Sequence, residues 1–79
     1  MTATKWDIKR WLDIAREKKA THLIVACDTF EYDDYPVYVM PGEDVKEKMK
    51  LGSMQSIMEV YDMSLNIDKQ TGEHRAYHV

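Results

Sequence analysis

The sequence predicts a small α+β domain that runs α-β-β-α-β-β and forms a four-stranded, mostly antiparallel sheet with both helices packed on one face. Three observations predict this class. An amphipathic stretch of helical period opens the chain, two runs rich in β-branched and aromatic residues follow, and the second half contains a long alternation of apolar and polar residues. A chain of 79 residues has room for one domain, so residues 1–79 are expected to fold as a single unit.

The first predicted helix covers residues 4–19. Thr4 followed by Asp7 resembles a capping box with Asp in place of Glu, and Lys18 and Lys19 suit the negative end of the helix dipole. The apolar residues of this stretch are spaced so that they share one face of a helix: Ile8, Trp11, Leu12 and Ala15.

The next elements are expected to be two strands, at residues 21–30 and 35–40, joined by a short polar connection of hairpin length. Pro36 cannot donate a hydrogen bond in a sheet, so it belongs at the start of the second strand or on a sheet edge. Pro41 and Gly42 end that strand, and a short polar helix is predicted from Val45 to about Leu51.

Residues 53–68 fit two patterns. Met54, Ile57, Met58 and Tyr61 form a helical stripe, whereas residues 61–68 alternate apolar and polar without interruption. The longer pattern favours a strand from about Ile57 to Asp68, with a hairpin turn at residues 69–72 and a last strand at residues 73–79. One face of the long strand is then expected to be buried: Tyr61, Met63, Leu65 and Ile67.

Charge is distributed unevenly along the chain. The formal net charge is −3, but residues 1–20 carry six Lys/Arg and three Asp/Glu, whereas residues 21–45 carry six acids and no Lys or Arg. The chain lacks the overall basic excess of a nucleic-acid binder, which argues against nucleic acid as a partner. The alternative function is nucleotide or nucleic-acid binding through the basic first helix and the two tryptophans, with these cations: Lys5, Lys9, Arg10 and Arg16.

The residues that commonly carry chemistry form no recognisable motif. Cys27 is the only cysteine and lies in an apolar run, where a thiol usually packs as a small hydrophobe. His74 and His78 would be too far apart on a strand to share a metal, and no glycine-rich phosphate loop precedes a helix. We therefore expect no catalytic residue, metal site or cofactor, and a protein that is not an enzyme. No stretch is apolar enough to be a membrane span or a signal peptide, which predicts a cytoplasmic protein.

The acidic connection between the first two strands is the main candidate for a partner contact, because tyrosines flanked by charge suit protein interfaces. The candidate residues are Glu31, Tyr32, Asp33, Asp34 and Tyr35. Two alternatives stand beside this interpretation. The connection can be an ordinary solvated turn, or it can bind a cation, although it lacks the spacing and the glycine of a calcium loop.

The first strand pair is apolar on both faces, although a sheet covered on one side should alternate apolar and polar residues. If the helices cover one face, an apolar patch is left for a second copy of the chain, which predicts a homodimer. The patch would consist of Ile24, Phe30, Tyr38 and Met40. The alternative is a monomer whose helices lie on opposite faces of the sheet and bury both.

Four short blocks carry a resemblance: Cys-Asp-Thr at 27–29, Asp-Tyr-Pro-Val-Tyr-Val at 34–39, Met-Glu-Val-Tyr-Asp at 58–62 and Glu-His-Arg-Ala-Tyr-His at 73–78. In this order they resemble small hypothetical proteins of tailed bacteriophages, a set with no function to carry over. The resemblance implies the cytoplasm of an infected bacterium as the setting. The first strand pair, apolar on both faces, and the missing catalytic motifs predict a non-catalytic protein that binds a partner. By analogy with small early phage proteins, the partner is expected to be a host or phage factor, bound in host takeover or in countering host defence.

Overall fold

The computed structural model describes residues 3–50, 52, 54–73 and 76–78, and these residues form an α+β fold around one antiparallel sheet. The elements follow in the order α1 (Lys5–Lys18), β1 (His22–Asp28), β2 (Asp33–Val39), α2 (Val45–Lys48), β3 (Gln55–Asp62) and α3 (Ile67–Thr71). The described strands lie in the order β2-β1-β3, so β1 is central and pairs antiparallel with both neighbours. The α+β class and the antiparallel sheet are thus confirmed.

Helix α1 forms where the sequence predicts it. The Thr4 hydroxyl accepts a hydrogen bond from the Asp7 amide at 3.3 Å, and the Asp7 carboxylate accepts one from the Thr4 amide at 3.0 Å. This capping box gives two backbone amides at the helix start, those of Thr4 and Asp7, a side-chain acceptor. The helix ends at Lys18 and is capped by Lys19, whose φ of 62° is left-handed. Leu12 and Ala15 are buried on the face toward the sheet.

Strand β1 is buried along its middle because both of its faces are covered. Residues 23–26 are all at most 1% exposed. A β-bulge interrupts its pairing with β3, since Val25 lies opposite Glu59 whereas Ala26 lies opposite Ile57. On the other side Val25 lies opposite Pro36, so the proline is on the edge strand β2, where it was expected.

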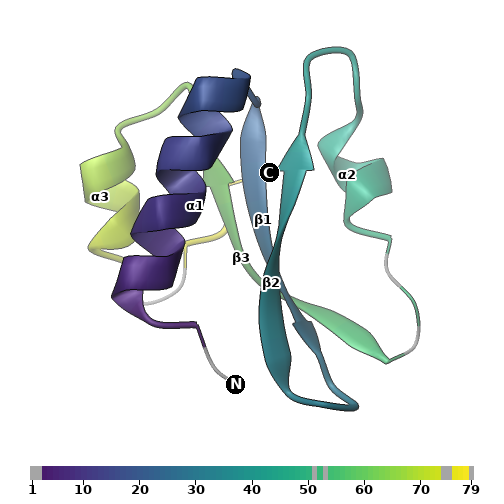
Figure 1. Cartoon of the computed structure of the whole chain (residues 1–79). Coiled ribbons are helices and arrows are strands. Elements are labelled where there is room, and N and C mark those ends of the chain that lie inside the picture. The colour runs from purple at the N-terminus through teal and green to yellow at the C-terminus, as the bar shows by residue number, and fades with distance from the viewer. Residues whose placement is uncertain (1–2, 51, 53, 74–75, 79) are drawn as a thin grey trace.

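The helices lie on opposite faces of the sheet, which corrects the expectation that they share one face (Figure 1). One face, with Leu23, Val25 and Tyr61, packs against α1 and against Ile67 of α3. The other face packs against α2, and its core consists of Ile24, Val39 and Val60, flanked by Val45 and Met49. Alternate residues of a strand point to opposite faces, so an apolar strand such as β1 needs a cover on each side.

The predicted strand over residues 57–68 is wrong in its second half. β3 ends at Asp62, and residues 67–71 form α3 in place of a hairpin turn. Asn66 begins this helix because its side chain accepts a hydrogen bond from the Lys69 amide at 3.0 Å. Leu65, expected on the buried face, is 51% exposed, while Tyr61 is buried and Met63 and Ile67 are half-buried.

The four-stranded sheet is not confirmed. Of the predicted last strand, residues 74–75 and 79 lie outside the described residues, and Tyr77 forms an isolated parallel bridge to Val60. The Val60 amide donates to the Ala76 carbonyl, and the His78 amide donates to the Val60 carbonyl, both at 2.9 Å. These described residues lie against the outer edge of β3, but the bridge is parallel and not part of an antiparallel hairpin. Ala76 is completely buried.

Candidate functional site

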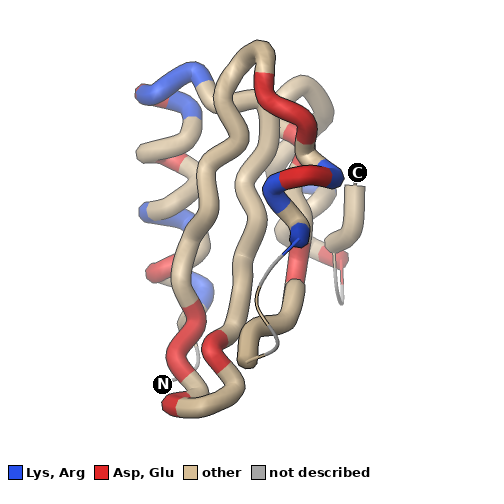
Figure 2. The backbone as a smooth tube through the Cα atoms, turned by 90° about the vertical axis from the view of Figure 1, so that its right-hand side faces the viewer, with Lys and Arg blue, Asp and Glu red and all other residues tan. Residues whose placement is uncertain are grey.

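The first candidate site is the acidic turn, which we define as residues 28–34 between and including the facing ends of β1 and β2. Asp28, Glu31, Asp33 and Asp34 place their charges at one end of the molecule, as Figure 2 shows. Local bonds hold the turn in place. The Thr29 amide and hydroxyl both donate to the Met54 carbonyl at 2.7 Å, and the Phe30 amide donates to the Asp28 carboxylate at 2.9 Å.

The turn exposes two aromatic rings. Phe30 and Tyr32 are each 71% exposed, and Tyr32 has a φ of 58°, in the left-handed region that residues other than glycine rarely occupy. Such a conformation persists only where the surrounding structure imposes it. The turn therefore has a defined backbone conformation that presents aromatic and acidic groups together.

The predicted partner-contact residues fall into two groups. Glu31, Tyr32 and Asp33 are exposed, whereas Asp34 and Tyr35 are half-buried. Asp34 accepts a hydrogen bond from the Ala3 amide at 2.8 Å, which joins the segment before α1 to the start of β2. Burial, with the nearby Asp28 carboxylate second, raises the pKa of Tyr35. Asp34 and Tyr35 thus serve the packing of this end of the molecule.

The four residues expected to form a self-association patch do not share a surface. Ile24 is completely buried under α2, whereas Tyr38 and Met40 pack against the cluster on the α1 side. The Lys18 ammonium lies 5.7 Å from the centre of the Tyr38 ring. Phe30 is exposed, but in the acidic turn. Self-association stays a prediction, and it now lacks the uncovered sheet face from which it was inferred.

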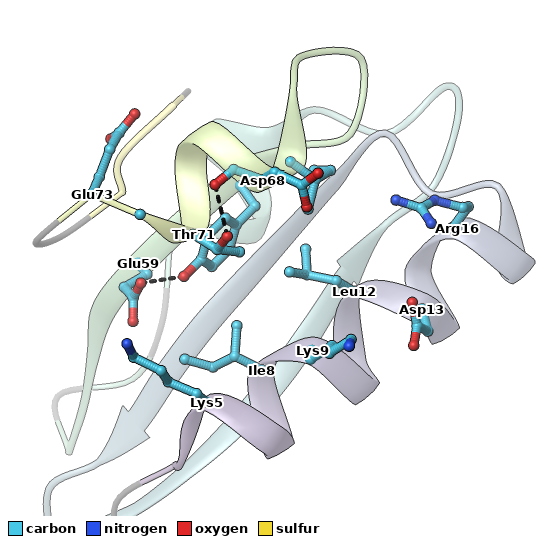
Figure 3. Close-up of a pocket in the computed structure, with 13 residues that line it drawn as sticks. Lys5, Ile8, Lys9, Leu12, Asp13, Arg16, Glu59, Asp68, Thr71 and Glu73 are labelled. Carbon is cyan, nitrogen blue, oxygen red and sulfur yellow. Dashed lines mark hydrogen bonds between the residues drawn. The ribbon is translucent and has the colours of Figure 1, made fainter.

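The second candidate site is the α1–α3 groove, an open cleft of about 650 Å³ between α1, β3 and α3. Ile8 and Leu12 of α1 (Figure 3) and Ile67 of α3 supply its apolar lining, and Tyr61 of β3 lines it as well. The groove continues past α3 along Gly72 and Glu73. A cleft of this size matches the sites that bind drug-sized ligands or short peptide segments.

The two walls of the groove carry opposite charge. Three cations lie on α1, and carboxylates of β3 and α3 lie across the groove from this helix, as Figure 3 shows. The cations are Lys5, Lys9 and Arg16, and the carboxylates across the groove are Glu59 and Asp68, whereas the Glu73 carboxylate points away from α1. Asp13 adds a carboxylate to the α1 wall.

A half-buried hydrogen bond lies at the base of the carboxylate wall. The Tyr61 hydroxyl donates to Glu59, and burial, with this bond second, raises the pKa of Tyr61 far above its ordinary value of 10. The phenol therefore stays protonated at physiological pH and acts as a donor that fixes the Glu59 carboxylate. Near the mouth, the His78 Nε2 lies 3.0 Å from the Glu73 carboxylate.

Sequence reasoning did not find this groove, because one of its walls is a helix that was predicted as a hairpin turn. Its signal was present locally. Asn66 is a preferred helix cap, and Asp68 follows in the first turn, where acids favour a helix start. The basic residues of α1 were singled out, and the structure divides them. Lys5, Lys9 and Arg16 line the groove, whereas Arg10 lies 3.5 Å from Asp7 outside it.

Neither the Cys27 thiol nor the metal-ligating side chains of the described residues give a further candidate site. Cys27 is half-buried, and burial, followed by a hydrogen bond with Asp34, raises the pKa of its thiol, which opposes formation of the reactive thiolate. Within the described part of the chain, no three His, Cys, Asp or Glu side chains are grouped so that they could hold a metal ion. None of the helices in that part is long and apolar enough to cross a membrane.

Known protein families, curated proteins and solved structures yield no match to this chain. The resemblance to phage proteins therefore stays a prediction, and function has to be inferred from the geometry of the two sites.

Proposed function

We propose that this chain is a small non-catalytic binding protein that contacts a partner protein through the acidic turn. The observation that carries this proposal is the exposure of Phe30 and Tyr32, each 71%, on a turn that hydrogen bonds hold in one conformation. Aromatic rings are the residues that most often anchor protein interfaces. A rigid turn loses little conformational freedom on binding, so more of the contact energy is available for affinity.

Charge indicates what kind of partner fits. Asp28, Glu31 and Asp33 surround the rings, and no Lys or Arg occurs between residues 21 and 45. The partner surface is therefore basic, with an apolar depression for the rings. Opposite charge steers the encounter and speeds association at low salt. Following the resemblance to phage proteins, we propose a host or phage factor as the partner, bound in the bacterial cytoplasm in host takeover or in defence evasion.

The alternative, nucleic-acid binding by α1, is less well supported. Arg10 is paired with Asp7, Lys18 lies over the Tyr38 ring, and Asp13 interrupts the line of cations along the groove. Trp11 packs against the core, although Trp6 is 80% exposed. Phosphate contacts of α1 would make affinity for bulk nucleic acid fall steeply with salt. Binding of nucleic acid at 50 mM salt that is lost both at 200 mM salt and on changing Lys5 and Lys9 to Gln would favour this alternative.

The test compares two matched double variants in affinity capture from a bacterial lysate, followed by mass spectrometry. In the first, Phe30→Ser and Glu31→Gln remove one exposed ring and one charge of the acidic turn. In the control, Leu65→Ser and Glu17→Gln remove one exposed apolar side chain and one exposed acid elsewhere. Both should melt within a few degrees of the parent, because surface substitutions cost about 0.5 kcal/mol or less.

We expect the parent and the control to retain the same partner, with less of it at high salt, and the acidic-turn variant to lose it. Equal retention by all three proteins would contradict the proposal, because the contact would then lie away from the turn.

A further inference from the structure

The α1–α3 groove keeps charges that the fold itself does not use. Lys5, Lys9 and Arg16 form no ion pair with any residue that the structure describes, although carboxylates stand on the facing wall. All three cations are exposed. The carboxylates of the facing wall can also accept further hydrogen bonds and ion pairs. Glu59 accepts one bond from Tyr61, and a carboxylate can accept several, whereas Asp68 has no ion-pair partner among the described residues.

The placement of the cations also works against α1. Lys5 is the first residue of the helix, where a positive charge opposes the helix dipole. Lys5 and Lys9 are four residues apart, so two like charges lie on neighbouring turns of one face. Residues that break local rules without a compensating contact in the fold are often retained for a ligand.

We propose that the α1–α3 groove binds a zwitterionic ligand of the size of a short peptide. Its anionic group lies against Lys5 and Lys9, which are one helical turn apart, and its cationic group lies against the facing carboxylates Glu59 and Asp68. The cavity of about 650 Å³ holds such a ligand, and Ile8, Leu12 and Ile67 contact the apolar part between its charges. A ligand with only one sign of charge leaves one wall unpaired and is repelled by it. This site is separate from the acidic turn and does not depend on it.

The probe is an acetylated and amidated tetrapeptide, Asp-Ala-Ala-Lys, titrated into isotopically labelled protein while backbone amide shifts are recorded by NMR. Two matched probes carry one charge each, with Asn in place of Asp or Gln in place of Lys. We expect shifts in α1, β3 and α3 with the zwitterionic probe, and binding about tenfold weaker or more with either singly charged probe. Titration of 6-aminohexanoate, a small zwitterion, distinguishes a free small molecule from a peptide segment as the source of this chemistry.

Single substitutions measure the contribution of each wall of the groove to binding. Lys9→Gln and Asp68→Asn should each weaken binding of the zwitterionic probe about tenfold, whereas Lys46→Gln on α2 should leave it unchanged. Lys5→Gln should raise the melting temperature while it weakens binding, which a merely structural lysine would not do. If Lys9→Gln fails to fold, Lys5→Gln tests the α1 wall, and if Asp68→Asn fails to fold, Glu59→Gln tests the facing wall. Absence of shifts with the zwitterionic probe, or equal affinity for the three peptides, would overturn the proposal.

Discussion

The two faces of the sheet reach the same burial by different means. On one face, Leu23 and Tyr61 lie beneath α1, a helix of 14 residues with a capping box, with α3 beside it. On the other, Ile24, Val39 and Val60 lie beneath α2, a helix of four residues, and the chain around it. Leu23 and Ile24 are adjacent in sequence and both completely buried. A short, well-placed segment can thus exclude water from a sheet as completely as a long helix.

The difference lies in how each cover responds to a loss of volume. Helix α1 is a stiff body held by its own backbone hydrogen bonds, so it cannot follow a small change beneath it. The segment around α2 is held mainly by single contacts, such as the Lys48–Glu43 ion pair at 3.0 Å and the bond from the Met40 amide to Glu43 at 2.9 Å. It can settle onto a smaller side chain. The cost of a cavity depends on how far a site can collapse.

The largest expected effect therefore distinguishes the two faces directly. Leu23→Ala and Ile24→Ala should each lower the free energy of unfolding by about 2–5 kcal/mol, with Leu23→Ala the more costly, because the space it leaves under α1 stays open. Chemical denaturation of both variants measures the difference. An equal or larger loss for Ile24→Ala would show that α2 is as rigid a cover as α1.

The next effect concerns the junction of β3 and α3 on the α1 side. The side chain of Gln70 is buried and bonds the backbone of Asp62 twice. Its Oε1 accepts a hydrogen bond from the Asp62 backbone amide at 2.8 Å, and its Nε2 donates one to the Asp62 carbonyl at 2.9 Å. Gln70→Leu keeps the volume but leaves the Asp62 amide unsatisfied, which should cost about 1–3 kcal/mol, whereas the Asp62 carbonyl keeps its bond from the Leu65 amide at 3.2 Å. Denaturation measures it, with the exposed Thr71→Val as the control. A loss no larger than that of the control would mean that water replaces the amide.

A smaller effect compares the helix starts. Thr4→Ala removes the cap of α1 and should cost about 1 kcal/mol. Asp44→Ala removes the bond from the Lys46 amide at 2.9 Å, and its effect should be smaller because α2 has a single turn to lose. Thermal melting of both variants gives the order. The reverse order would indicate that the α2 cover depends on its cap more than on its apolar contacts.

The smallest effect is the response to acid. A hydrogen bond from the Thr4 amide lowers the pKa of Asp7, and one from the Met40 amide lowers that of Glu43, below ordinary values of 3.8 and 4.5. A carboxyl group whose pKa is lower in the folded state than in the unfolded state stabilises the fold at pH values above its unfolded-state pKa. This stabilisation is lost as the pH falls through the folded-state pKa. Asp7→Asn and Glu43→Gln should each flatten the decline of stability below about pH 4. An unchanged slope would show that other carboxyls dominate.

Local signals allowed the first half of the fold to be predicted. The Thr4–Asp7 box, the apolar stripe of α1 and the β-rich runs of β1 and β2 act within a few residues, and each element formed within two residues of its expected bounds. The largest differences are at the turn, because β1 ends at Asp28 and β2 begins at Asp33. The error came where two local signals overlapped. The alternation after Tyr61 suits a strand, but the Asn66 cap and the Gln70 amide bond to Asp62 stabilise a helix there. The choice between them depended on tertiary contacts of Gln70.

The two candidate sites also differ in how far the sequence predicts them. The exposure of Glu31, Tyr32 and Asp33 could be predicted, because a polar hairpin connection is usually solvated. The groove could not, because it brings α1 together with residues at the other end of the chain, and α3 was missed. The placement of both helices on one face also failed, since an apolar pattern on both faces fits a second helix as well as a second copy of the chain.

Pro36 on the edge strand β2 has a further consequence for behaviour at high concentration. A sheet edge offers a row of amide and carbonyl groups on which strands of other molecules can assemble into cross-β fibres. A proline is accommodated on an edge strand where its nitrogen faces solvent, and it leaves a gap in the donors of that row. The acids Asp33 and Asp34 begin the same strand and repel an identical copy. We therefore expect fibres seeded from β2 to be suppressed, and Pro36→Val to shorten the lag before thioflavin fluorescence rises.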